Sequence, residues 1–441
     1  METSETRPVL GWGRQFTLSF YWLTWNIQWT AIIVILMPLQ VLSMVGEENK
    51  ATAVGIVTSI GAIISLVLPP LIGALSDRTR SKMGRRKPYM LWGSVIDGGA
   101  LLLLAFVPLW FEMPMAIVFY VAAMMLLQFG SSVATSPYSA LIPDVVPKAQ
   151  MGQASGWLAL MSLIGIFLGN FIGGFHSDLF GGIVETYWVM LMLFAIGIVI
   201  TMLGVKEPSV SPSVEPFKWN EYWQGLMEPL KDHNFRWVFL TRMFVEGGQW
   251  TVQAFLLFYF RDLFFGSGGS VELFGLTVDK PEQSVTFFLA AVLLGAIPSS
   301  YLAGHLSDKF GRKPMVYIAS GLMSIVVVMF AFNVIPVFAG VVLLGLVFGL
   351  GHGTYKSVDW ALACDVLPSE DDFAKDMGVW HIAMMVPQVL FLPLAGFLLD
   401  TFQSVGQSAG IAHLGYTVIF SMACVLFVLG TVFIVKIRGI R

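Results

Sequence analysis

Two apolar stretches of this sequence carry charged and amide side chains at helical spacing. The polar members are Arg242, Glu246, Gln249 and Gln253 within residues 236–262, and His352, Lys356 and Asp359 within residues 336–365. Steps of three and four residues place each set on one face of a helix. Charges inside an apolar helix are costly unless they are paired, so such a face marks a binding or proton-transfer site.

Glu246 is the residue of these two faces that is best suited to bind and release a proton. Arg242 lies one turn before it, and Lys356 lies at a similar distance from its own helix end, so an ion pair between the helices is expected. A nearby cation favours the ionised carboxylate, while loss of water favours the protonated one. We therefore predict that Glu246 is the carboxylate that binds and releases a proton as the protein works, which we call the coupling carboxylate. The alternative is a permanent structural ion network. The other members of the coupling group are Arg242, Lys356, Asp359 and His352.

A second set of residues suits a sugar-like solute. Aromatic faces stack on the apolar face of a sugar ring, while amides and hydroxyls bond its hydroxyl groups. The candidates are Trp25, Asn26, Gln28, Gln128, Ser132, Gln249, Gln253, Trp360, Trp380 and His381. Trp25 is the preferred stacking residue, although packing or a place at the membrane interface is the alternative for any single tryptophan. Asp97, a lone acid inside an apolar run, is expected to face a structural partner.

The elements that position these residues must lie in a membrane, because the composition cannot cover a soluble surface. Of the 441 residues, 56% are hydrophobic and 12% are charged, whereas a soluble protein carries about 25% charged residues. A net charge of −3 gives no basic surface for nucleic acid. Cys364 and Cys424 lie in apolar runs and offer neither a disulfide framework nor a metal site. We expect no metal and no cofactor, with the lipid bilayer as surroundings.

Apolar runs divide the chain into twelve expected membrane helices, which makes it an all-α polytopic membrane protein. Their spans are 16–45, 51–75, 89–110, 114–143, 151–176, 186–205, 236–262, 284–304, 314–332, 336–365, 374–400 and 411–436. The longest polar interruption follows the sixth span and contains PSVSPSVEP. We therefore expect an N-terminal six-helix bundle (1–205), a cytoplasmic linker (206–235) and a C-terminal six-helix bundle (236–441).

Basic residues predict the orientation of these helices. Twenty of the 25 lysines and arginines fall in the termini and the loops on one side, and three fall in the loops on the other. Basic loops stay in the cytoplasm, so both termini are expected there.

The two halves of the chain repeat each other. GALSDRTRSKMGRRKP (Gly73–Pro88) returns as GHLSDKFGRKP (Gly304–Pro314), and Asp144-Val-Val-Pro returns as Asp365-Val-Leu-Pro. Gly174-Phe-x-x-Asp178 also returns as Gly396-Phe-x-x-Asp400. A parallel 6+6 repeat of this kind is typical of transporters that bind their solute near mid-membrane between two bundles.

The loop GHLSDKFGRKP resembles the signature of the major facilitator superfamily. Its longer copy, SDRTRSKMGRRKPY, is similar to that of glycoside–pentoside–hexuronide cation symporters and sucrose-type transporters, as are Trp25-x-x-Gln28 and FLLFYFRD (Phe255–Asp262). The resemblance implies the major facilitator fold, alternating access, and gate roles for the loop residues. These are Asp77, Arg78, Gly84, Arg85, Arg86, Asp308, Gly311 and Arg312.

The chain departs from these families at their coupling positions. Sucrose-type members carry a carboxylate in the fourth span where this chain has Gln128, and melibiose-type members carry paired aspartates in the second span, where residues 51–75 have none. The coupling ion is therefore left as a proton or sodium.

The resulting prediction is a monomeric secondary transporter of the bacterial inner membrane that takes up a sugar or glycoside with protons or another cation. The alternatives are a proton-coupled drug or metabolite exporter, which the glycine-rich GIFLGNFIGG (Gly165–Gly174) would suit, and a non-transporting membrane assembly protein. Close helix packing is the other interpretation of that glycine run. An enzyme is not expected, because GQSAG (Gly406–Gly410) is placed in a loop without the strand and helix that a nucleophile elbow needs.

Overall fold

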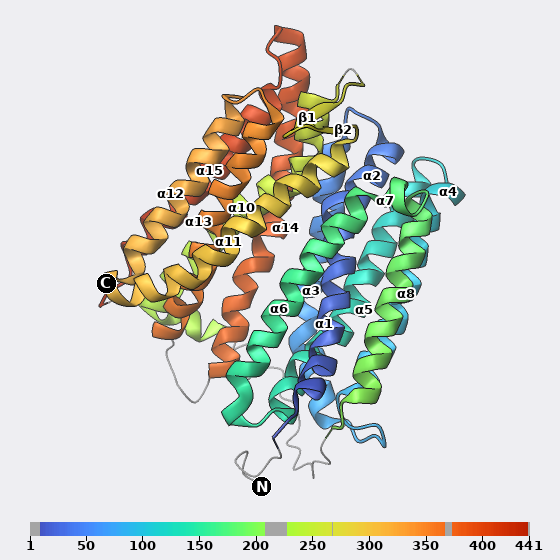
Figure 1. Ribbon diagram of the computed structural model, residues 1–441, viewed down its shortest axis with the longest axis vertical. Coiled ribbons are helices and arrows are strands. Elements are labelled where there is room, and N and C mark those ends of the chain that lie inside the picture. The colour runs from blue at the N-terminus through green and yellow to red at the C-terminus, as the bar shows by residue number, and fades with distance from the viewer. Residues whose placement is uncertain (1–8, 208–226, 267, 367–372, 440–441) are drawn as a thin grey trace. The chain divides into compact units, whose positions relative to one another are not determined.

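The computed structural model describes residues 9–207, 227–266, 268–366 and 373–439, and these are almost entirely helical (Figure 1). They form two compact units. Unit 1 comprises residues 1–44 and 60–217, and unit 2 comprises residues 45–59 and 218–441. Helix α3 therefore begins in unit 2 and ends in unit 1. Much of the predicted linker, residues 208–226, lies outside the described part of the chain.

The helices of unit 1 follow one another with short connections. They are α1 (Trp12–Ala31), the π-helical turn η1 (Ile32–Leu36), α2 (Met37–Val45), α3 (Lys50–Arg78), α4 (Lys87–Trp110), α5 (Met115–Val145), η2 (Lys148–Gln150), α6 (Met151–Gly174), α7 (His176–Leu179) and α8 (Ile183–Gly204). Helices α1, η1 and α2 run without interruption, so they form one span, Trp12–Val45.

Unit 2 repeats this plan and adds a small hairpin. Its elements are η3 (Pro229–Lys231), α10 (His233–Phe264), β1 (Val271–Leu273), β2 (Leu276–Val278), α11 (Pro281–Phe310), α12 (Arg312–Ala331), α13 (Phe338–Asp365), α14 (Phe373–Ala409) and α15 (Leu414–Ile434). Strands β1 and β2 pair antiparallel, a feature that the sequence did not predict. The motif GQSAG was expected in a loop, but it lies at the end of α14, because the helix continues nine residues past the predicted boundary.

The prediction of an all-α polytopic membrane protein is confirmed. Eleven helices of the described residues are long and apolar enough to cross a membrane. The described elements contain a twelfth helix of sufficient length, α10, with 32 residues. This helix is less apolar than the other eleven, because it carries both the polar stripe and charged residues near its ends.

Small residues allow the helices of each unit to pack closely. In unit 1, Gly165 and Gly169 of α6 face the backbone of α1, where an added Cβ would lie 2.6 Å from the Leu23 carbonyl oxygen or 2.5 Å from that of Ile27. Larger side chains are excluded there. Of the two interpretations of the glycine-rich run of α6, these contacts support close helix packing.

Candidate functional site

A network of four charges, three of them buried, joins α10 to α13 in unit 2. The guanidinium of Arg242 bonds the carboxylate of Asp359, and Nη2 of Arg242 lies 3.8 Å from Oε1 of Glu246. Lys356 Nζ lies 2.5 Å from the same Glu246 oxygen, so the expected ion pair between these helices is present. Two anions and two cations therefore compensate each other where an isolated charge would be costly.

The network is extended by a phenol and covered by aromatic rings. The Tyr355 hydroxyl donates to Asp359 Oδ1 over 3.2 Å. The guanidinium of Arg242 lies over the ring of Trp380 on α14, 3.5 Å from its centroid, in a cation–π contact. Trp380 is buried and meets Trp360 edge to face, at a centroid distance of 5.4 Å. The charges of α10 and α13 are thus held against an aromatic wall.

Local sequence explains how α10 can present this polar face while packing tightly elsewhere. Asp232 caps its first turn, because its side chain accepts a hydrogen bond from the amide of Phe235 over 2.8 Å. Gly247 and Gly248 follow Glu246 and meet the rings of Phe391 and Phe427, which an added Cβ would approach to 2.5 and 2.6 Å.

The remaining polar candidates of unit 2 make no hydrogen bond to these four charges in the described part of the chain, although His352 and His381 lie close enough to interact electrostatically with Glu246 and Lys356. Gln249 is buried, and its amide contacts the sulfur of Met323 at 3.6 Å, whereas Gln253 is half-buried. His381 bonds the Met377 carbonyl through Nδ1 over 2.8 Å. His352 is half-buried on the face of α13 that carries Lys356.

In unit 1, three tryptophans of α1 form a stacked ladder. The rings of Trp22 and Trp25 lie 4.6 Å apart at 8°, and those of Trp25 and Trp29 lie 5.6 Å apart at 7°. Tyr138 of α5 stacks on Trp22 at 5.8 Å, and the Trp25 indole donates to Ser131 over 2.8 Å. Both faces of Trp25 thus meet another indole, which leaves Trp29 at the end of the ladder as the better stacking surface.

The amide candidates of unit 1 already hold protein partners. Gln28 donates to Asp97 Oδ1 over 2.5 Å, so Asp97 has the structural partner that was expected. Gln128 accepts from the Ser65 hydroxyl over 2.6 Å, and Asn26 accepts from Ser162 over 3.2 Å. Ser132 is buried on α5. The prediction that these residues and those of unit 2 line one cavity concerns both units together and stays a prediction.

The predicted gate residues form the same cluster in each unit. In unit 1, Arg86 bonds Asp77, Asp144 (3.0 Å) and Ser76 (2.5 Å). In unit 2, Arg312 bonds Asp308 (2.6 Å), Asp365 (3.0 Å) and Ser307 (2.6 Å). Arg86 therefore joins the end of α3 to α5, and Arg312 joins the end of α11 to α13.

Glycines and neighbouring residues complete these clusters. Gly84 and Gly311 adopt φ values of 101° and 97°, which favour glycine. Arg85 adds a second bond to Asp144, over 2.7 Å, and Arg78 donates to the Ala74 carbonyl over 2.7 Å.

The lysines beside these arginines make contacts that the sequence did not predict. Lys87 donates to the carbonyls of Met202 (2.9 Å) and Val205, and Lys313 donates to that of Ile437 (2.6 Å). Each lysine thus binds carbonyls at the end of the last helix of its unit. Arg-Lys-Pro occurs in both loop copies, and this repeat was the signal that could have marked the two lysines as equivalent.

The role of Glu207 was not predicted from the sequence either. Its carboxylate accepts from the amides of Arg85 (2.7 Å) and Arg86 (2.9 Å), and so caps the start of α4. Nothing in the sequence links a residue that follows α8 to the start of α4.

A further ionic cluster of unit 2 lies at the start of α3. Lys50 is buried and bonds Asp262 over 2.6 Å and Glu47 over 3.0 Å. Arg261 lies 2.6 Å from Glu47, and the Tyr416 hydroxyl donates to Asp262 over 2.5 Å. Glu47 is partly buried, which raises its pKa, but Lys50 and Arg261 outweigh this and hold the pKa below its ordinary value.

Asp400 fixes the start of the same helix. Its carboxylate accepts hydrogen bonds from the amides of Thr52 (2.7 Å) and Ala51 (3.3 Å), which gives the first turn of α3 an anionic cap. Among the described residues, no group of three or more histidines, cysteines or acids is arranged to hold a metal ion.

The chain is similar in sequence and in fold to known transport proteins. Residues 48–371 match the family described as MFS/sugar transport protein. The chain is 27% identical over 332 residues to the multi-drug resistance efflux pump PmrA of Streptococcus pneumoniae, covering 73% of this chain and 74% of the pump. It is 28% identical over 174 residues to the human proton-associated sugar transporter A, covering 35% of this chain and 23% of that protein. The crystal structure of a mutant of the nucleoside transporter NupG aligns with a TM-score of 0.75 at 13% identity, covering 96% of this chain and 100% of that one.

Proposed function

This chain belongs to the family of MFS/sugar transport proteins, and from that premise we propose that it imports a sugar or glycoside by symport with protons. It is a multi-pass membrane transporter of a small solute. The network of Arg242, Glu246, Lys356 and Asp359 is the single observation that carries the proposal, because a transporter needs ionisable groups inside the membrane to couple an ion to its solute.

Glu246 is the proposed coupling carboxylate. It shares Lys356 and Arg242, so an ionised Glu246 is stabilised while both cations remain in place. Lys356 has a side chain 35% exposed, whereas that of Glu246 is 3% exposed. Withdrawal of the more accessible lysine toward water or solute would leave the carboxylate buried beside Arg242 alone, a state that favours uptake of a proton.

The proposed solute contact of unit 1 is Trp29, at the end of the indole ladder. That of unit 2 is the aromatic wall of Trp360 and Trp380. A sugar presents an apolar ring face and several hydroxyls, which match a flat indole and neutral amide groups. Similarity to a protein named proton-associated sugar transporter A supports this class of solute and this coupling ion. We propose a plasma membrane location, with both termini in the cytoplasm, from the distribution of basic residues.

Sugar counterflow in proteoliposomes tests the proposal. Purified protein is reconstituted with unlabelled sucrose, maltose or glucose inside, and uptake of the labelled sugar is measured together with pH changes in weakly buffered vesicles. We expect saturable exchange of at least one sugar. In separate vesicles that contain no sugar, addition of that sugar should make the outside medium alkaline, because net uptake of the sugar takes protons with it. Absence of exchange for all three sugars and for a wider glycoside panel would reject a sugar substrate.

The coupling residue is tested by Glu246→Gln. Solute-driven proton uptake should be abolished while counterflow persists, because exchange needs no net deprotonation. Glu272→Gln, the same change on the exposed strand β1, serves as the matched control. Proton uptake at the wild-type level in Glu246→Gln would reject the assignment, and loss of folding would favour the structural network.

Efflux of drugs or metabolites is the second candidate function. It is supported by the similarity over 73% of this chain to a protein named as a multi-drug resistance efflux pump. Inside-out vesicles with an imposed proton gradient would accumulate a cationic dye such as ethidium if this alternative holds, and would not do so for a sugar symporter.

A further inference from the structure

Asp97 is the one charged residue in the middle of the helices that surround it. The other charged residue of α4 is Lys87 at its start, α1 carries Arg14 in its first turn, α5 carries Asp144 near its end, and α8 carries Glu185 in its first turn. The side chain of Asp97 is fully buried, and the described part of the chain gives it no ion pair.

The groups that face Asp97 are neutral. The amide of Gln28 and the phenol of Tyr21 lie toward it from α1. From α5, Gly130 packs against its backbone so closely that an added Cβ would lie 2.6 Å from the Asp97 amide nitrogen. The helix α8 brings the ring of Phe194 against Tyr21, with 5.7 Å between centroids. An ionised carboxylate would have no compensating charge here.

The hydrogen bonds between Asp97 and Gln28 are incomplete in a specific way. Gln28 Nε2 donates to Asp97 Oδ1 over 2.5 Å, yet Gln28 Oε1 and Asp97 Oδ2 are both buried with no partner among the described residues. Both orphans are acceptors. Elsewhere in the same unit the buried amide of Gln40 is fully used, since its oxygen accepts from Tyr120 and Tyr187 and its nitrogen donates to a carbonyl.

We propose that Asp97 and Gln28 form a proton-binding site in unit 1, in which Asp97 is a neutral carboxylic acid. A single proton on Oδ2, taken from water, turns that oxygen into a donor and can satisfy Gln28 Oε1. The acid and the amide then pair through two hydrogen bonds, one in each direction. One added proton thereby removes both the buried charge and both unpartnered acceptors.

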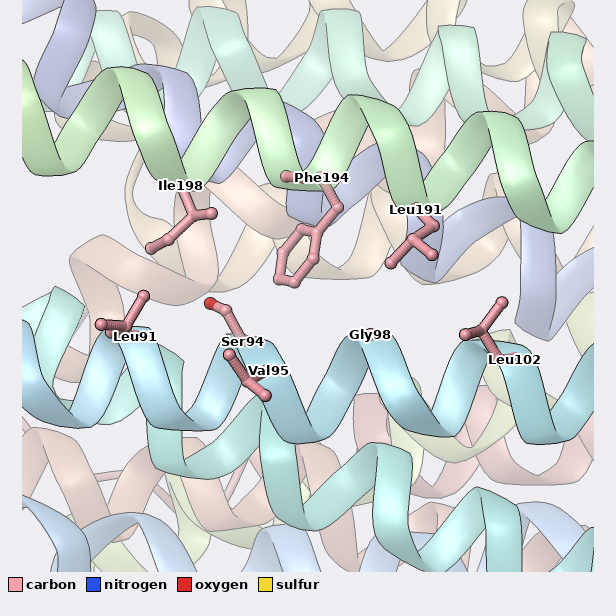
Figure 2. Close-up of a pocket in the computed structure, with 9 residues that line it drawn as sticks. Leu91, Ser94, Val95, Gly98, Leu102, Leu191, Phe194 and Ile198 are labelled. Atoms are coloured by element: carbon pink, nitrogen blue, oxygen red, sulfur yellow. The ribbon is translucent and has the colours of Figure 1, made fainter.

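The hydroxyl of Ser94 marks a route by which this proton can be exchanged. Ser94 lies one turn before Asp97, and its oxygen points into a groove of about 280 Å³ between α4 and α8, otherwise lined by apolar residues such as Val95 and Phe194 (Figure 2). This hydroxyl is buried and lies beside the Tyr21 phenol, so a water molecule in the groove reaches it only by displacing that contact.

Infrared difference spectroscopy tests the site without any solute. The carbonyl stretch of a protonated carboxyl lies apart from that of a carboxylate and shifts in D2O. We expect wild-type protein at neutral pH to show a protonated-carboxyl band that Asp97→Asn lacks, and that the control Glu272→Gln, on exposed strand β1, retains. Identical spectra for wild type and Asp97→Asn would overturn the proposal, as would loss of the band in the control.

A second variant covers a failure of Asp97→Asn to fold. Gln28→Leu removes the amide but keeps the acid, so the band should persist and move to higher frequency, because its hydrogen bond is lost. An unchanged band in Gln28→Leu would show that the acid is not paired with Gln28 and would overturn the site.

The role of this proton in transport rests on the proposed function. In counterflow, wild-type exchange should fall severalfold as the pH is raised from neutral to alkaline, because an ionised Asp97 has no partner. Asp97→Asn is neutral at every pH and should lose this fall, whereas Glu246→Gln should keep it. A parallel fall in Asp97→Asn would overturn the role. If wild-type protein exchanges no solute, the proposed function fails, while the infrared result still decides the site.

Discussion

Each unit buries acids in the middle of membrane-spanning helices, but the two units supply opposite surroundings. In unit 2, Glu246 and Asp359 share Arg242 and Lys356, so two negative charges face two positive ones. In unit 1, Asp97 faces one amide, and the described residues offer it no cation. The same carboxyl group is thus kept as a partner of charges in one place and as a neutral hydrogen-bonding group in the other.

The difference follows from the free energy of charge burial. Moving an ion out of water costs several kcal/mol even after relaxation, so a buried acid either acquires a cation or keeps its proton. Which of these applies determines how a substitution acts. Removing a cation from the network of unit 2 leaves a charge exposed to apolar surroundings, whereas replacing a neutral acid by a neutral amide changes little.

Among the variants considered, Arg242→Met is expected to destabilise the protein most. It leaves Asp359 without its cation and Glu246 with Lys356 alone, which should lower the free energy of unfolding by about 3–5 kcal/mol. Thermal unfolding of purified protein in detergent measures this loss. The control is Arg236→Met on the exposed side of the same helix, which should change stability by less than about 0.5 kcal/mol. Equal effects of the two variants would show that the network does not stabilise unit 2.

Two isosteric variants compare the ionisation of Asp359 and Asp97 directly. Asp359→Asn removes a charge that Arg242 needs and should cost about 2–4 kcal/mol. Asp97→Asn exchanges a neutral acid for a neutral amide and should cost less than about 1 kcal/mol. Both are read by the same unfolding assay at neutral pH. A larger cost for Asp97→Asn than for Asp359→Asn would reverse the assigned ionisation of the two sites.

The matching loop clusters predict a smaller effect that is equal in both units. Asp77→Asn and Asp308→Asn each weaken a half-exposed bond to an arginine, so stability should change by less than about 1 kcal/mol. If these loop contacts hold a cytoplasmic gate closed, as we propose, each variant should favour the inward-open state. Labelling of single cysteines on the cytoplasmic side should rise in both variants and not in the control Asp279→Asn. Unchanged labelling in both would reject the gate role.

The smallest expected effect concerns the ionic cluster at the start of α3. Glu47 has a pKa that is lower when the protein is folded than when it is unfolded, because Lys50 and Arg261 outweigh the effect of partial burial. Its contribution is therefore present above the unfolded pKa of about 4.3 and is lost as the pH falls through the folded pKa. The side chain is 59% exposed, so we expect less than about 1 kcal/mol. Melting temperatures of Glu47→Gln should depend less on pH in this acidic range than those of the wild type, and identical pH profiles would contradict the assignment.

Patterns within one helix were predictable from the sequence. Apolar runs gave the helices because a membrane leaves the backbone no other way to satisfy its hydrogen bonds. The repeat of Asp144 in Asp365 anticipated that the two loop clusters would match, and the spacing on α10 and α13 anticipated the pair of Glu246 and Lys356. The boundaries were less certain, since α14 continues to Ala409 through residues that also suit a loop.

Apart from Glu246 and Lys356, which are 110 residues apart, partners from distant parts of the chain could not be predicted in this way. The sequence marked Gln28 as a solute ligand, but its side chain donates a hydrogen bond to Asp97, which lies 69 residues further along the chain. Trp25 was preferred for stacking because of its adjacent amides, yet the ring positions place it between two other indoles. Side-chain direction within a helix shows which residues share a face, and only the packing of helices shows what that face meets.

The sequence by itself determined that this chain is a membrane protein of repeated helical halves, because hydrophobicity, helical period and internal repeats are properties of the chain read locally. The tertiary structure alone decided the electrostatic character of its buried acids. Asp97 and Asp359 are both aspartates within apolar helices, and the sequence shows a cation on the helix face of Asp359 alone. What distinguishes them is whether another helix brings a guanidinium or an amide within hydrogen-bonding distance, and in surroundings of low dielectric constant that neighbour decides between a charge and a proton.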